Sequence, residues 1–120
     1  METPNPLKTK SFSFAIRIIQ LCNEIQTTQK EFILTNQLTR SGTSIGALFR
    51  EAEHAESKRD FIHKLSIAQK ECNETLYWLE LMEGTAFISQ NQAIELKNEG
   101  IEILKILTRI ILLSSKASLK

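Results

Sequence analysis

The sequence predicts an all-α protein folded as an antiparallel up-down-up-down four-helix bundle. Apolar residues recur at alternating spacings of three and four in four successive segments, which is the pattern of amphipathic helices. The chain holds only four glycines and two prolines, and no run alternates between apolar and polar residues as a half-buried strand does. Because the links between the segments are short, consecutive helices are expected to lie antiparallel.

The composition is that of one small folded domain. A chain of 120 residues is too short for two ordinary domains, and its 42% hydrophobic content argues against disorder. Fifteen Lys and Arg face fourteen Asp and Glu, so the net charge of +1 lacks the large positive excess of a dedicated nucleic-acid binder. We expect a flexible N-terminal arm over residues 1–10, the bundle over residues 11–115 and a tail over residues 116–120.

The first helix is predicted to begin with Ser11 as its N-cap, because both prolines lie in the ten residues before it. Its expected apolar face is broad and consists of Phe12, Ala15, Ile19 and Cys22, with Phe14, Ile18, Leu21 and Ile25 beside them. The polar run over residues 26–29 is predicted to form a turn.

The second helix is predicted from Glu31 onward by a heptad pattern, which is typical of helices packed at a shallow angle. Its expected core positions are Leu34, Leu38, Ser41, Ile45, Leu48, Ala52 and Ala55. Gly42 and Gly46 lie inside this helix, where each lowers helix propensity by about 1 kcal/mol relative to Ala. Two glycines four residues apart indicate the close approach of a neighbouring helix, and a local kink is the alternative.

Ser57 and Asp60 form a capping-box pattern that predicts the start of the third helix. The same four-three spacing continues through Phe61, Leu65, Ala68, Cys72, Thr75, Leu79 and Met82, and Gly84 is expected to end the helix. The fourth helix is predicted from about Asn91 to Leu113, with Gly100 as a weak position.

The end of the fourth helix is apolar around nearly its whole circumference. A helix in a monomeric bundle buries only one stripe, so the surplus indicates burial against another subunit. We expect this interface to include Ile106, Leu107, Ile110 and Leu113. The alternative is that the N-terminal arm covers this surface.

No catalytic, metal or cofactor site is expected. Four-helix bundles hold di-iron centres with Glu-x-x-His motifs, and Glu51 with His54 and Asp60 with His63 have that spacing. All four residues lie off the heptad positions, so two solvated histidines near a turn are the expected interpretation. The chain also lacks a phosphate-binding glycine loop, because the segment 41–46 follows no strand and has no Gly-Lys-Ser/Thr ending.

The cysteines and the N-terminus indicate a cytoplasmic protein. Cys22 and Cys72 stand alone in apolar helical patterns, and each is expected to be a buried free thiol. The N-terminus lacks the apolar core of a secretory signal. The most apolar stretch, residues 101–113, is shorter than the ~20 residues of a membrane span and contains two charges, so no membrane association is expected.

A local basic patch is the only sequence feature that favours nucleic-acid contact. In an up-down bundle the N-terminal arm, the turn between helices two and three, and the C-terminal tail meet at one end. The cations expected there are Lys58, Arg59 and Lys64 near the turn, Lys8 and Lys10 on the arm, and Lys116 and Lys120 on the tail. They could bind phosphates; the alternative is that they only keep the protein soluble.

Five motifs in the middle of the chain are distinctive: Gln37-Leu38-Thr39-Arg40-Ser41-Gly42-Thr43-Ser44-Ile45-Gly46-Ala47, Arg50-Glu51-Ala52, Ser57-Lys58-Arg59-Asp60-Phe61, Ile67-Ala68-Gln69-Lys70-Glu71 and Glu74-Thr75-Leu76-Tyr77-Trp78-Leu79. Together they resemble the bacterial four helix bundle proteins, also called 23S-rRNA intervening-sequence proteins or assigned by name to a ribosomal-protein family. The resemblance covers about residues 12–113.

The resemblance implies a bundle that assembles into a ring-like homopentamer. A related group serves as an accessory protein of diversity-generating retroelements and binds nucleic acid and a reverse transcriptase, so RNA or an RNA-associated protein is an implied partner. The family commonly has Asn after the first Ala of its central motif, where this chain has Leu48. Arg40, Ser44 and Glu51 keep the family pattern and could form a polar network within or between bundles, or simply pack the helices.

We therefore expect a non-catalytic oligomeric bundle that acts as an RNA-associated scaffold or adaptor. One alternative is a protein–protein interaction module with no nucleic-acid role. The other, less favoured, is a di-metal oxidase that uses the two His-carboxylate pairs.

Overall fold

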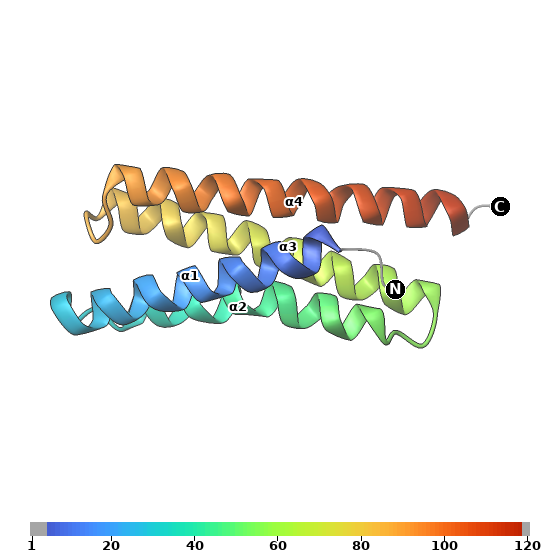
Figure 1. Ribbon diagram of the computed structural model, residues 1–120, viewed down its shortest axis with the longest axis horizontal. Helices are drawn as coiled ribbons and strands as arrows, with labels where there is room; N and C mark the ends of the chain where they lie inside the picture. Colours follow the sequence, from blue (N-terminus) through green and yellow to red (C-terminus); the bar gives the residue numbers. More distant parts are fainter. Residues whose placement is uncertain (1–4, 119–120) are drawn as a thin grey trace.

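The structure, a computed structural model, describes residues 5–118, with side chains through Lys116. It contains four helices and, over these residues, no strand: α1 (Pro6–Gln29), α2 (Ile33–Glu53), α3 (Lys58–Gly84) and α4 (Gln90–Ser118). The helices run alternately in opposite directions (Figure 1), which confirms the four-helix bundle. Each packs on two neighbours, in the cyclic order α1, α2, α3, α4.

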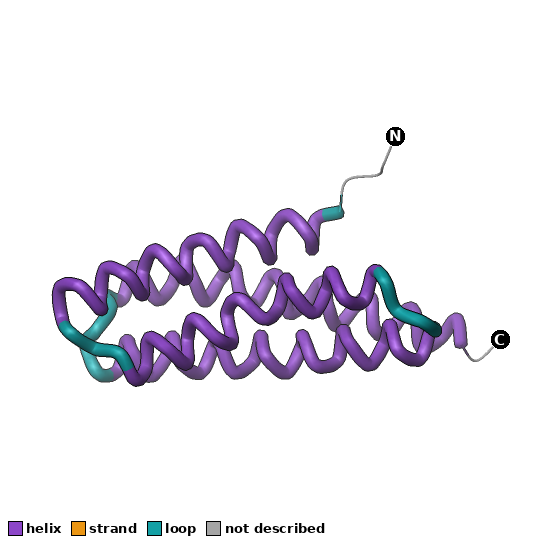
Figure 2. Tube along the Cα trace, turned by 90° about the horizontal axis from the view of Figure 1, so that it is seen from below, coloured by secondary structure: helices purple, strands orange, loops and turns teal. Residues whose placement is uncertain are grey.

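The turns and chain ends gather at the two ends of the bundle. The α1–α2 and α3–α4 turns lie together at one end (Figure 2). The α2–α3 turn lies at the opposite end, together with the start of α1 and the end of α4. The start of α1, the α2–α3 turn and the end of α4 therefore meet at one end of the bundle, as predicted.

The first helix begins earlier than predicted. Asn5 caps α1, because its Oδ1 accepts hydrogen bonds from the N–H groups of Leu7 (3.1 Å) and Lys8 (3.3 Å). Pro6 occupies the first helical position, where its missing N–H costs nothing. The flexible arm predicted over residues 1–10 is thus wrong for residues 5–10, and residues 1–4 lie outside the described part. Ser11 is a buried residue inside α1 and not its cap.

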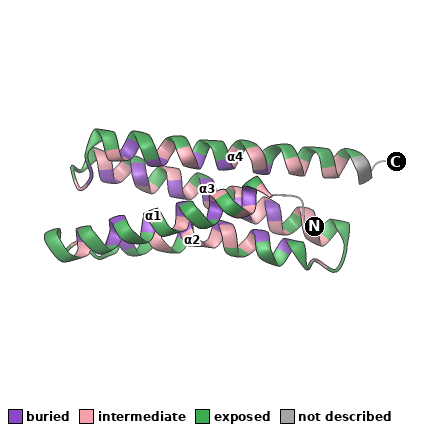
Figure 3. Ribbon diagram, in the orientation of Figure 1, coloured by how far each residue is buried: buried purple, intermediate pink, exposed green. Residues whose placement is uncertain are grey.

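The early start of α1 also changes which face is buried (Figure 3). The buried residues of α1 keep the heptad spacing from Leu7 onward: Leu7, Ser11, Phe14, Ile18, Leu21 and Ile25, with Cys22 beside them. Phe12 and Ile19, predicted to face the core, are 56% and 40% exposed. In α2, Phe49 is buried and the predicted Leu48 is only half-buried. Both segments are helical as predicted, but the face that each helix buries depends on the neighbouring helices.

The close approach predicted at the two α2 glycines is confirmed. A Cβ on Gly42 would lie 3.1 Å from Ile18 Cγ2, and one on Gly46 would lie 3.1 Å from Ser11 Oγ. Helix α2 is continuous from Ile33 to Glu53. Gly100, predicted as a weak position, is a third close approach, since its Cβ would lie 2.8 Å from Leu76 Cδ2.

Side chains cap the remaining helices. The predicted cap of α3 is present, because Ser57 Oγ accepts from the Asp60 N–H at 3.0 Å. The start of α2 is capped by Glu31, whose carboxylate accepts from the N–H groups of Leu34 and Thr35, both at 2.9 Å. The start of α4 has a capping box that was not predicted, in which Ser89 and Gln92 bond reciprocally at 2.9 and 3.1 Å.

Candidate interaction surfaces

The predicted basic end is largely neutralised by carboxylates. Of the seven cations expected there, three form ion pairs: Lys8 with Glu53 (3.6 Å), Lys10 with Glu102 (2.6 Å) and Lys64 with Glu51 (3.4 Å). Lys58 and Arg59 are exposed and form no ion pair with any described residue. Lys116 is exposed on the last turns of α4, and Lys120 lies outside the described residues. The end therefore carries mixed charge.

Two of the three paired carboxylates, Glu51 and Glu53, lie at the end of α2 just before the α2–α3 turn, and the third, Glu102, lies on α4. The segment 50–64 contains four cations (Arg50, Lys58, Arg59, Lys64) and four carboxylates (Glu51, Glu53, Glu56, Asp60), so its formal charge is zero. The acids interleaved in this segment are visible in the sequence, whereas the partner of Lys10 is not, because Glu102 lies on α4.

The two His-carboxylate pairs do not come together as a metal centre. Glu51 bonds to Lys64, and Asp60 accepts from the Glu56 N–H at 3.3 Å. His54 and His63 are exposed. Over residues 5–118, no three His, Cys, Asp or Glu side chains gather in a way that could hold a metal ion.

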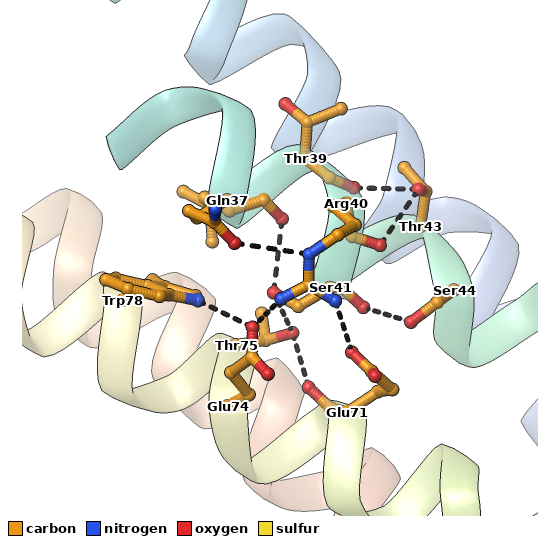
Figure 4. A network of polar contacts seen from close by, with 11 residues as sticks. Gln37, Thr39, Arg40, Ser41, Thr43, Ser44, Glu71, Glu74, Thr75 and Trp78 are labelled. Carbon is orange, nitrogen blue, oxygen red and sulfur yellow. Dashed lines mark hydrogen bonds and ion pairs between the residues drawn. The ribbon is translucent and has the colours of Figure 1, made fainter. Parts of the chain in front are cut away.

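The strongest polar cluster lies on the α2–α3 face and is centred on Arg40 (Figure 4). The Arg40 guanidinium bonds to Glu71 at 3.1 Å, to Glu74, and to Gln37 at 3.2 Å. Glu74 also accepts from the Trp78 indole N–H at 2.9 Å. Every charge in this cluster has a partner within the chain, so the cluster joins α2 to α3.

The predicted network of Arg40, Ser44 and Glu51 is not formed within the chain. Ser44 donates to the Ser41 carbonyl of its own helix at 2.8 Å, and Glu51 pairs with Lys64 instead. The three residues share the α2 side near α3 but are each bonded separately. Beneath them, the hydroxyl of Thr75 donates to Ser41 Oγ at 3.0 Å, and both residues are fully buried. Within one bundle these positions therefore serve helix packing, the alternative considered above.

A second charged seam joins α1 to α4. Arg17 bonds to Glu99 and, at 3.1 Å, to Glu95, while Lys10 bonds to Glu102. The acidic residues recur at spacings of four and three on α4, so the sequence contained a signal for this seam. Arg17 was not among the predicted site residues.

Exposed apolar side chains form a row on each of two helices. Helix α1 carries Phe12, Ile16 and Ile19 on its outer side, each at least 40% exposed. The Arg50 guanidinium lies 5.7 Å from the Phe12 ring centre, which is a cation–π distance. Helix α4 carries a second set: Ile94, Ile101, Leu112 and Leu113.

The predicted interface residues of α4 divide into three groups. Leu107 is fully buried in the core of its own bundle, so it cannot also contact another subunit, and its assignment is wrong. Ile106 and Ile110 are half-buried against the core, and Leu113 is 55% exposed. The apolar circumference of α4 is thus partly absorbed by contacts with α1 and α3.

Both cysteines are buried free thiols, as predicted. Burial raises the pKa of Cys72 to about 12, and its Sγ donates to the Gly100 carbonyl at 3.2 Å. Burial also raises the pKa of Cys22, against a smaller opposing effect of Thr39. Neither thiol has the lowered pKa of a nucleophile.

No described helix combines the length and apolar character that a membrane span requires.

Comparison with known proteins places this bundle in a family. A model of the 23S rRNA-intervening sequence protein family matches residues 6–109. The chain is 51% identical to a protein of unknown function from the S23 ribosomal protein family of Bacteroides thetaiotaomicron, known from its crystal structure. The match covers 88% of this chain and 97% of that one, with a TM-score of 0.86. No curated protein matches the sequence. The chain therefore belongs to the 23S rRNA-intervening sequence protein family.

Proposed function

We propose that the protein is a non-catalytic oligomeric scaffold whose copies meet through the exposed apolar rows of α1 and α4. The observation that carries the proposal is the row of Phe12, Ile16 and Ile19, which lies outside the bundle core although it consists of large apolar residues. Contiguous exposed apolar surface on a soluble protein typically marks an interaction site.

The position of the two rows favours a ring over a dimer. They lie on different helices, so contact between the α1 row of one copy and the α4 row of the next is heterologous. Heterologous contacts that close produce cyclic oligomers, and the family resemblance implies a homopentamer. Each large side chain that is half-exposed contributes on the order of 1 kcal/mol when its remaining apolar surface is covered.

Light scattering tests the assembly directly. We expect a solution mass several times the chain mass of 13.7 kDa. Replacing Ile16 or Leu112 with Glu should lower that mass, because a charge would then be buried at the subunit contact. Ile33→Glu is the matched control, since Ile33 is 78% exposed at the α1–α2 turn and belongs to neither row. A monomeric wild-type protein at micromolar concentration would refute the proposal.

RNA association is the second candidate function. It is supported by Lys58 and Arg59, which are exposed and form no ion pair within residues 5–118, and by the family name, 23S rRNA-intervening sequence protein. Structured RNA should be retained at low salt and released at high salt, because phosphate contacts displace counterions. If no RNA is retained at low salt, a protein–protein interaction module is the better description.

Two buried free thiols agree with a cytoplasmic location.

A further inference from the structure

An aromatic side chain is exposed beside the Arg40 cluster of the α2–α3 face. Tyr77 is 56% exposed, and its ring packs edge-on against that of Trp78, with the ring centres 5.2 Å apart. Trp78 is half-buried and donates its indole N–H to Glu74 (Figure 4). Glu74, Tyr77 and Trp78 stand at positions i, i+3 and i+4 of α3, so they are neighbours on one side of the helix.

Leu81 extends this group by one turn, because it follows Tyr77 by four residues and Trp78 by three. It is half-buried, as Trp78 is. We call these four residues, Glu74, Tyr77, Trp78 and Leu81, the aromatic–acidic patch. The patch has a carboxylate at one end, two aromatic rings in its middle and an aliphatic side chain at its other end.

The carboxylate of the patch is only partly neutralised within the chain. Arg40 bonds to both Glu71 and Glu74, so one positive charge is shared by two carboxylates. The Arg40 guanidinium and the Trp78 indole both donate to Oε2 of Glu74, and no described residue donates to Oε1. Because the Glu74 side chain is 31% exposed, this second oxygen can accept from a group outside the chain.

The segment around the patch is acidic as well. Residues 71–96 contain five carboxylates and no Lys or Arg, so this part of the surface attracts cations and repels phosphate groups. Aromatic rings bind cations over their faces. The guanidinium of arginine can both stack on a ring and donate to a carboxylate, and its methylene stem covers apolar surface. An arginine side chain therefore matches every component of the patch.

The α2–α3 face also stays open in the assembly proposed above. Phe12 of the α1 row lies beside Arg50 of α2, with the guanidinium 5.7 Å from the ring centre. Ile101 of the α4 row precedes Thr108 by seven residues, and Thr108 accepts from Gln69 of α3, so this row lies on the α3 side of α4. The two rows thus follow the α1–α2 and α3–α4 sides, and the α2–α3 face lies between them.

We propose that the aromatic–acidic patch binds an arginine side chain from a basic segment of a partner protein. The guanidinium stacks on the exposed ring of Tyr77 and donates to Oε1 of Glu74, while the methylene stem lies along Trp78 and Leu81. The inference rests on the scaffold function proposed above, because it names the kind of protein that the scaffold holds.

The fluorescence of Trp78 gives a direct readout, because it is the only tryptophan of the chain. A labelled octa-arginine peptide is titrated at physiological salt, with octa-lysine for comparison. Peptide anisotropy measures the affinity, and the emission of Trp78 reports whether the peptide reaches the patch. We expect the emission to change on binding and octa-arginine to bind more tightly than octa-lysine. The solution mass is measured on the same samples.

Two pairs of variants test the patch. Glu74→Gln and Tyr77→Ala should each weaken octa-arginine binding on the order of fivefold or more. Glu24→Gln removes the same charge from an exposed position of α1 at the same end of the bundle, and Phe32→Ala removes a ring that is 50% exposed outside the patch. Both of these controls should bind nearly as the wild-type protein does.

Arg40→Gln should have the opposite effect, because it removes the cation that shares Glu74 with the ligand. We expect it to bind octa-arginine more tightly, although it loses an ion pair of the fold. A merely structural role of the cluster predicts weaker binding instead. Circular dichroism of each variant confirms that the helices are retained.

Several results would overturn the assignment. They are an unchanged Trp78 emission on binding, equal weakening by Glu74→Gln and Glu24→Gln, and equal affinity for octa-lysine. Binding of a labelled RNA hairpin that Tyr77→Ala weakens would assign the ring to base stacking instead. A lowered solution mass of Tyr77→Ala would assign it to assembly. An oligomeric wild-type protein that does not bind octa-arginine refutes the patch alone, whereas a monomer that binds it refutes the assembly and supports the patch.

Discussion

The contact of Gly42 with Ile18 allows a quantitative test of how α1 and α2 are held together. A Cβ at position 42 would lie 3.1 and 3.2 Å from Cγ2 and Cγ1 of Ile18, which is tighter than an ordinary contact. Ile18 is fully buried and β-branched, so it cannot turn away from the added methyl group. Overpacking of this kind costs about 1–3 kcal/mol, while the gain in helix propensity returns about 1 kcal/mol. Gly42→Ala should therefore destabilise the bundle by about 1 kcal/mol.

The matched control is Gly84→Ala at the end of α3. Nothing lies within 4 Å of a Cβ at Gly84, and no glycine of the described chain has a positive φ. This variant should be neutral or up to about 1 kcal/mol more stable. Urea unfolding followed by circular dichroism at one protein concentration measures both, because the change in midpoint reports the change in free energy of unfolding.

A double-mutant cycle isolates the contact itself. Ile18→Ala removes the atoms that the new methyl group would meet, at the cost of a cavity. In that background Gly42→Ala should become stabilising, because only its propensity effect remains. An unchanged effect of Gly42→Ala in both backgrounds would refute the close approach of α1 and α2 described here.

Four further outcomes follow from single contacts. Asn5→Ala should lower the free energy of unfolding by about 1 kcal/mol through loss of the α1 cap, measured by urea unfolding, and no change would mean that the helix starts later. Burial opposes ionisation of Glu31, but hydrogen bonds from backbone N–H groups lower its pKa overall. The ionised carboxylate therefore stabilises the folded protein at neutral pH, and this stabilisation is lost as the pH falls through the pKa of the folded state. The difference in free energy of unfolding between wild type and Glu31→Gln should accordingly vanish in acid. Arg40→Ala should destabilise by about 1 kcal/mol, and Glu71→Gln in the same background should recover part of it if the ion pair is the cause. The Cys72 thiol should react with a thiol reagent near pH 8 only at the rate of unfolding, and rapid reaction in the native protein would contradict its burial.

The sites were less predictable than the fold. The pairing of Lys8, Lys10 and Lys64 with carboxylates could not be seen by counting cations, because Lys10 and Glu102 are far apart in the sequence and meet only through α1–α4 packing.

Local spacing was enough to predict four amphipathic helices joined by short links, because the three-four repeat of apolar residues depends only on neighbouring positions. It did not fix the ends of the helices: residues 26–29, predicted as a turn, continue α1, and α2 begins at Ile33. The sequence also predicted the close approach at Gly42 and Gly46, since glycine inside a helix has few other uses. That Phe12 faces outward and Leu7 inward, and that Leu107 belongs to the core, became clear from the packing of the four helices. An apolar stripe wider than one contact surface fits several rotations of a helix, and the neighbouring helices select the one that buries the most surface at the closest packing.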